Sequence, residues 1–208
     1  MRLQTPFEER LNAISHGVGA LLGIVALVLL IKNNSDKTTY SLFSVIIYGV
    51  SIILLFTAST LYHAINNETY KHYFRILDHI SIYVLIAGTY TPVTLIVLEQ
   101  SHGWQLFYAV WGIAVFGTLL KLFFTGKFEI FSTLLYLVMG WLIVFDFSNL
   151  SHAIGSDGIL FLFAGGLAYT AGIIFYAIGR IPFNHVIWHL FVLAGAICHF
   201  FMIFFYVI

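Results

Sequence analysis

Long apolar stretches separated by short polar connections constrain the fold of this chain more than any other feature. A helix needs about 20 predominantly apolar residues to cross the hydrocarbon core of a bilayer, and seven such stretches follow one another along the 208 residues. We predict transmembrane helices at residues 14–31, 43–64, 77–98, 104–124, 130–147, 158–178 and 187–208. Their connections span roughly 5 to 12 residues, too few for a separate soluble domain. The sequence therefore predicts an all-α membrane protein in which residues 1–208 form a single seven-helix transmembrane domain.

The composition supports this fold class and narrows the possible partners. Charged residues make up 9% of the chain, whereas soluble proteins carry about 25%. Nine Lys and Arg residues balance nine Asp and Glu residues, so no net positive charge attracts nucleic acid. The single cysteine, Cys198, excludes an internal disulfide and the zinc motifs that use paired cysteines. Membrane lipids are therefore the expected partners, no loop or helix face identifies a soluble protein partner, and a metal ion would need His, Asp or Glu ligands.

The distribution of Lys and Arg predicts the orientation of the bundle, because cytoplasmic connections carry an excess of these residues. With seven spans, one side has only Lys32 and Lys37. The other side collects seven basic residues: Arg2, Arg10, Lys71, Arg75, Lys121, Lys127 and Arg180. This asymmetry places the N-terminus in the cytoplasm and the C-terminus outside, in the plasma membrane.

A few ionisable side chains lie within the predicted spans, where such groups mark functional sites. His185 and His189 are four residues apart at the start of the seventh span, so they share one helix face. Ser59 and His63 have the same spacing at the end of the second span, and Asp78 is at the start of the third. In the predicted topology, all five residues lie at one depth near the cytoplasmic face.

This set of residues predicts an intramembrane zinc site. Three neutral imidazoles, from His63, His185 and His189, leave a fourth tetrahedral position open for water, as in catalytic zinc sites. Asp78 is better suited to holding and deprotonating that water than to ligation, although a ligand role stays open. The Ser59 hydroxyl would form a hydrogen bond with the same water. The alternative is a hydrogen-bonded polar network that only ties the three helices together.

Two further histidines lie in the predicted spans without an assigned role. His16 is one turn from Asn12 in the first span, where anchoring the helix is favoured over direct chemistry. His199 is fourteen residues beyond His185, or roughly 21 Å along a helix axis, so it cannot share the same site. An interior packing role is favoured there over a second ligand site or a proton relay.

Several motifs of the sequence resemble those of the bacterial haemolysin III family. They are Ser59-Thr60-Leu61-Tyr62-His63, Asp78-His79, the AGTYTP run at 87–92 and the RIPFNHVIWH run at 180–189. That family is similar to the progestin and adipoQ receptors, within a superfamily that includes alkaline ceramidases. The resemblance implies three zinc ligands, His63, His185 and His189, and a water held by Asp78. It does not decide the activity, because one fold and site can serve both enzymes and receptors.

Three hypotheses about function follow. The first is a zinc-dependent hydrolase of a lipid amide or ester, with Asp78 as general base and Ser59 supporting the developing oxyanion. The second is a non-enzymatic sensor or regulator of membrane lipid state, in which the metal ties helices together. The third, a pore-forming cytolysin, is disfavoured because no helix carries a polar stripe that would line an aqueous path. The sequence does not separate the first two.

Overall fold

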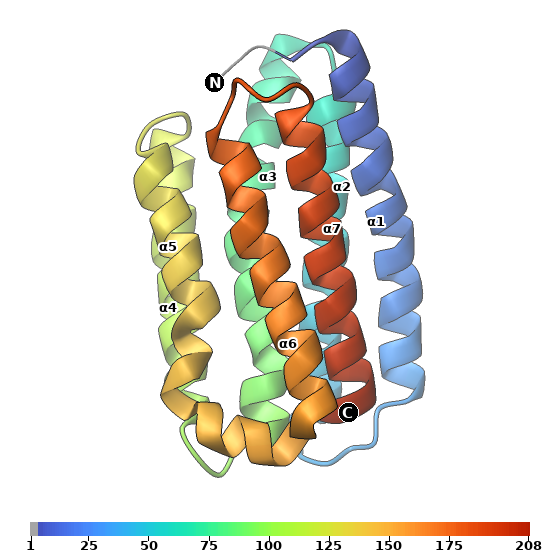
Figure 1. Cartoon of the computed structure of the whole chain (residues 1–208), viewed down its shortest axis with the longest axis vertical. Helices are drawn as coiled ribbons and strands as arrows, with labels where there is room; N and C mark the ends of the chain where they lie inside the picture. Colours follow the sequence, from blue (N-terminus) through green and yellow to red (C-terminus); the bar gives the residue numbers. More distant parts are fainter. Residues whose placement is uncertain (1–3) are drawn as a thin grey trace.

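The computed structural model describes residues 4–208, and the regular structure in this range is helical throughout, which confirms the predicted all-α fold class (Figure 1). Seven α-helices and three shorter helical turns make up these described residues. In chain order they are α1 (Pro6–Lys32), α2 (Ser41–Ala64), α3 (Glu68–Pro92), the π-helical turn η1 (Val93–Val97), α4 (Gly103–Phe124), α5 (Glu129–Trp141), the 3-10 turn η2 (Leu142–Asp146), α6 (Phe147–Ala177), α7 (Asn184–Met202) and the π-helical turn η3 (Ile203–Val207). Arg2, which contributed to the predicted orientation, lies outside the described residues.

Six helical segments of residues 4–208 are long and apolar enough to cross a membrane, so the chain is a multi-pass membrane protein. One of them, Glu129–Ala177, has 49 residues, about 74 Å if it were a single straight helix. It is not straight, because Gly155 has a φ of 66° and interrupts the helical backbone. Figure 1 shows the chain reversing direction inside this segment, so that α5 and α6 run antiparallel. The predicted helices at 130–147 and 158–178 correspond to these two arms.

Polar capping residues make two helices begin earlier than predicted. The Thr5 side chain accepts a hydrogen bond from the Glu8 amide at 3.2 Å while the Glu8 carboxylate accepts one from the Thr5 amide at 2.8 Å, which starts α1 at Pro6. Such a capping box satisfies amides that have no partner within the helix. Asn67 caps α3 in a similar way, so that helix begins nine residues before the predicted position 77. The expectation that Asp78 lies at the start of the third helix is therefore wrong, because Asp78 lies within α3.

The α3 helix changes its winding at Pro92. Proline lacks an amide hydrogen and disrupts the regular hydrogen-bond ladder, and here it is followed by η1. Neighbouring hydroxyls bond to backbone carbonyls: Thr91 Oγ1 donates to the Ala87 carbonyl at 2.8 Å, and Thr94 Oγ1 donates to the Tyr90 carbonyl at 2.9 Å. Pro92 thus perturbs α3, and the adjustment is a change of helix type inside a buried segment.

The centre of the bundle is formed mainly by α2 and α3. In the most apolar window of each helix, 72% of residues are buried in the α3 segment, against 28% in α1 and 28% in α4. The apolar faces of α1 and α4 are exposed in the isolated chain and are suited to contact lipid. In Figure 1 the α2–α3, α4–α5 and α6–α7 connections lie at the same end of the bundle as the N-terminus. Residues near these three connections therefore share one end.

Gly103 provides a test of the packing between α4 and the end of α3. A Cβ atom at this position would lie 2.1 Å from the Thr94 carbonyl oxygen and 2.4 Å from that of Leu98, both in the backbone. We expect Gly103→Ala to lower the free energy of unfolding by about 1–3 kcal/mol, because overpacking forces the backbone to shift. Gly112→Ala on the same helix is the control, since nothing lies within 4 Å of its added Cβ. Thermal unfolding in detergent measures both, and equal stability of the two variants would contradict the packing.

Candidate metal centre

Three histidines from two helices converge at the end of the bundle that carries the N-terminus. His63 lies in the last turn of α2, and His185 and His189 lie in the first turns of α7. One ligand nitrogen of each lies within 4.8 Å of those of the other two, close enough to hold one metal ion. The ring centroids are 5.1 Å apart for His63 and His185, 4.8 Å for His63 and His189, and 4.7 Å for His185 and His189. The spacing of the sequence motifs predicted this set.

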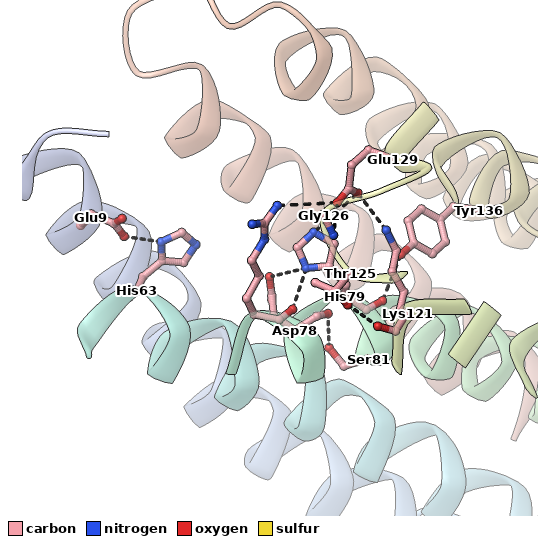
Figure 2. Close-up of polar contacts among 11 residues, drawn as sticks. Glu9, His63, Asp78, His79, Ser81, Lys121, Thr125, Gly126, Glu129 and Tyr136 are labelled. Atoms are coloured by element: carbon pink, nitrogen blue, oxygen red, sulfur yellow. Dashed lines mark hydrogen bonds and ion pairs between the residues drawn. The ribbon is translucent and has the colours of Figure 1, made fainter. Parts of the chain in front are cut away.

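The surroundings of His63 fit a metal ligand. Its Nδ1–H donates to Glu9 Oε2 at 2.6 Å, and Figure 2 shows this carboxylate reaching the imidazole from α1. Glu9 Oε1 also accepts from Lys71 Nζ at 3.1 Å. The other ring nitrogen, Nε2, is buried without a hydrogen-bond partner among the described residues. A carboxylate on the far nitrogen fixes the tautomer and ring orientation of metal-binding histidines, so His63 Nε2 has a lone pair available for a metal.

His189 is held in a similar way by α1. Its Nδ1–H points to the Asn12 carbonyl at 3.4 Å, which leaves the Nε2 lone pair free. The imidazole of His16 stacks on that of His189, with 3.6 Å between ring centroids and 10° between planes. His16 Nε2 lies 3.4 Å from the His189 carbonyl oxygen. These contacts agree with the anchoring role predicted for His16, and they show that α1 supports two of the three histidines.

Asp78 and Ser59 line a cavity of about 160 Å³ together with His185 and His189. The cavity extends from this end of the bundle between α3, α5, α6 and α7, and its walls are mostly apolar. The Ser59 side chain is buried, and its hydroxyl has no hydrogen-bond partner among the described residues. Both oxygen-bearing groups are thus available to a ligand or a water in the cavity.

His79, the neighbour of Asp78, also lines the cavity, and its Nδ1 lies 3.9 Å from Asp78 Oδ2. It joins Asp78 to an ionic cluster that Figure 2 shows beside α4 and α5. Its Nδ1–H donates to the Arg75 carbonyl at 2.7 Å, and its Nε2 lies 3.9 Å from Glu129 Oε2. Glu129 is paired with the fully buried Lys121 at 2.8 Å. Lys121 therefore lies inside the bundle in the last turns of α4, within the predicted helix 104–124, although it was counted among the basic residues of the cytoplasmic side.

His199 lies away from the three-histidine group, in the second half of α7. Its Nε2–H donates to the Leu162 carbonyl of α6 at 3.3 Å, and its ring lies against Gly165. The side chain also lines the cavity. This placement agrees with the predicted interior packing role, and the described residues give His199 no metal-binding partner.

Comparison with known proteins identifies the family of this chain. A family model described as haemolysin-III related matches residues 4–200. The chain belongs to the haemolysin III family. It is 46% identical to Hemolysin-3 of Bacillus cereus over 202 residues, which cover 97% of this chain and 92% of the relative. It is 45% identical to the Hemolysin-3 homolog of Bacillus subtilis (strain 168) over 200 residues, with 96% and 94% covered.

The family relationship extends beyond bacteria. The human monocyte to macrophage differentiation factor is 30% identical over 208 residues, covering 96% of this chain and 84% of the relative. The residues matched by the family model, 4–200, include His63 of α2 and both histidines of α7. The resemblance to the haemolysin III family that the sequence motifs indicated is therefore confirmed.

Glu9 was not assigned a role in the sequence analysis, and the structure makes it the partner of His63. The spacing of Glu9, Asn12 and His16 is a signal that could have found it, because these three polar residues share one face of an apolar helix. We expect Glu9→Gln to weaken metal binding about 10–100-fold, as loss of a carboxylate behind a histidine ligand does. Competition with a chromophoric chelator measures the change. Glu68→Gln is the control, since Glu68 is exposed at the same end, and an effect as large as that of Glu9→Gln would contradict the specific role.

Proposed function

We propose that this haemolysin III protein binds zinc at His63, His185 and His189 and hydrolyses an amide or ester bond of a membrane lipid. The observation that carries the proposal is the group of three histidines, two of which, His185 and His189, line an apolar cavity together with Asp78 and Ser59. Zinc suits an all-histidine set with an open fourth position. A lipid chain suits the apolar walls, because moving apolar surface out of water is favourable.

The proposal includes seven membrane crossings, with the N-terminus in the cytoplasm and the C-terminus outside. Antiparallel α5 and α6, joined through the break at Gly155, would supply two crossings from the 49-residue segment. The excess of basic residues near the connections at the N-terminal end supports the orientation. The site would then lie near the cytoplasmic face of the plasma membrane.

The residues around the cavity supply the acid–base chemistry of a hydrolysis. A bound zinc ion would supply Lewis acidity that polarises the carbonyl and acidifies water. Asp78 accepts a proton from the attacking water and returns it to the leaving amine or alkoxide, so that an acid and an amine or alcohol are released. The Ser59 hydroxyl donates to the carbonyl oxygen as negative charge develops there. The apolar walls exclude other water molecules from the reacting bond.

Turnover by purified protein tests this function. Zinc-loaded wild-type protein in detergent is incubated with a panel of lipid amides and esters, and released fatty acid is measured by mass spectrometry. We expect turnover of at least one lipid class, loss of turnover after the metal is removed with a chelator, and recovery on adding zinc. Turnover that survives complete metal removal, or none across the panel with zinc bound, would contradict the hydrolase.

A non-enzymatic regulator of membrane lipid state is the second candidate. The observation that favours it is the contact of α1 with both metal-binding helices, through Glu9 to His63 and through His16 to His189. A metal would then hold α1, α2 and α7 together. A lipid in the cavity would shift the equilibrium between two arrangements of these helices. Lipid binding that changes the stability of the metal-loaded protein without any turnover would favour this candidate.

A further inference from the structure

Arg75 lies at the entrance of the cavity, and several N–H donors of its guanidinium group have no hydrogen-bond acceptor among the described residues. It is three residues before Asp78 on α3, one turn closer to the end of the bundle, and lines the same cavity. Its side chain is 35% exposed, and its ion pair with Glu129 is long, at 3.6 Å. Glu129 is already occupied by Lys121 at 2.8 Å and by the Gly126 amide at 3.2 Å. The guanidinium therefore offers several N–H donors to a ligand.

Two tyrosine hydroxyls accompany Arg75 at this entrance. Tyr62 from α2 and Tyr176 from α6 both line the cavity together with Arg75. Among residues 4–208, neither hydroxyl makes a hydrogen bond. The ring of Tyr176 is fixed against Trp188, with 5.5 Å between centroids, and that of Tyr62 lies under Lys71 Nζ at 5.1 Å. One guanidinium and two phenolic O–H groups from three helices thus surround the entrance.

The charges around this entrance are more positive than negative. Asp78 lines the cavity on the side of the three histidines, and Glu129 lies beside Arg75 on the side of α5 and is paired with the buried Lys121. Three further basic residues lie at the entrance or on the adjoining connections: Arg75, Lys127 and Arg180. Lys71 is neutralised by Glu9. A negatively charged group would be attracted to this end of the cavity.

We propose that Arg75, Tyr62 and Tyr176 bind the phosphate of a lipid whose apolar chain occupies the cavity. Guanidinium groups bind phosphate through paired, charge-assisted hydrogen bonds, and the two hydroxyls can donate to the remaining oxygens. A neutral lipid offers no anionic oxygens to these donors. The inference rests on the proposed lipid function and specifies its ligand as a phosphate-bearing lipid.

The test compares a pair of lipids that differ only in the phosphate. Oleoyl lysophosphatidic acid and monoolein have the same chain and glycerol, and glycerol 3-phosphate supplies the headgroup without a chain. Binding to full-length wild-type protein is measured in phosphate-free maltoside detergent by tryptophan fluorescence, because Trp141 and Trp188 line the cavity. We expect the phosphate lipid to bind about tenfold or more tightly than monoolein. Glycerol 3-phosphate is expected to bind more weakly than either.

Substitutions then test whether the residues at the entrance cause the preference for the phosphate lipid over monoolein. Arg75→Gln is expected to remove the preference for phosphate while monoolein binding is unchanged, and Arg75→Lys to retain part of it. Lys127→Gln is the matched control, because Lys127 is exposed on the neighbouring connection and does not line the cavity. Tyr176→Phe removes one hydroxyl and keeps the ring, so it tests the site if Arg75→Gln does not fold. It is expected to reduce the preference severalfold.

Each other result contradicts the inference in a distinguishable way. Equal binding of both lipids by the wild type would overturn the phosphate site and leave the lipid cavity intact. If glycerol 3-phosphate binds as tightly as the phosphate lipid, the site recognises a free phosphate ester, and the claim that the phosphate belongs to a lipid is contradicted. A preference lost in His189→Ala but kept in Arg75→Gln and Tyr176→Phe would move the phosphate to the metal centre. Failure of both lipids to bind would overturn the phosphate-bearing glycerolipid as the occupant of the cavity, whereas the proposed hydrolase is tested separately by turnover of the lipid panel.

Discussion

Replacement of His189 by alanine is expected to abolish metal binding, from about one ion per chain to below about 0.1. The remaining two imidazoles, on different helices, do not complete a three-ligand site, and the stacking partner His16 has its Nε2 directed to the His189 carbonyl. The measurement is elemental analysis of purified, untagged variant and wild type after identical exposure to zinc.

His199→Ala is the matched control for this experiment. His199 is on the same helix and lines the same cavity, but it does not belong to the three-histidine group. The control is expected to keep a full equivalent of metal. Equal metal loss in both variants would show that metal content follows the general integrity of α7, and retention of a full equivalent by His189→Ala would contradict its role as a ligand.

The second large effect is expected at Asp78. Replacement by asparagine keeps the size of the side chain and removes its ability to accept a proton, so turnover of the lipid should fall about 10²–10⁴-fold. Metal content should stay near that of the wild type, because Asp78 is proposed to act on water and not as a ligand. The two measurements are single-turnover hydrolysis and elemental analysis on the same preparation.

Asp157→Asn controls for the loss of a carboxylate, since Asp157 is exposed in α6 away from the cavity, and it should leave turnover unchanged. Loss of metal in Asp78→Asn would show that Asp78 is a metal ligand. Unchanged turnover with a full complement of metal would remove it from the acid–base chemistry.

Much of the helical fold and the three histidines could be predicted from the sequence, because both depend on local spacing. Apolar runs of about 20 residues identify helices in a membrane protein, and a four-residue spacing puts His185 and His189 on one face. The helix starts were less accurate, because the polar turns before residues 14 and 77 are helical through the caps at Thr5 and Asn67. Hydropathy does not report such caps.

The supporting contacts could not be predicted, because they depend on how separate helices pack. Glu9 reaches His63 across 54 residues of sequence, and Lys121 meets Glu129 only because α4 and α5 pair at their connection. A charge count treats Lys121 as a cytoplasmic marker, whereas its side chain is fully buried. The break at Gly155, which lies inside α6, requires a positive φ that glycine adopts readily.

Elemental analysis combined with X-ray absorption spectroscopy of untagged wild-type protein tests the metal centre most directly. The predicted result is about one zinc per chain, bound by three imidazole nitrogens at about 2.0–2.1 Å. Absence of metal in the purified protein, with none taken up on adding zinc, would contradict the site and leave His63, His185 and His189 as a network that ties α2 to α7.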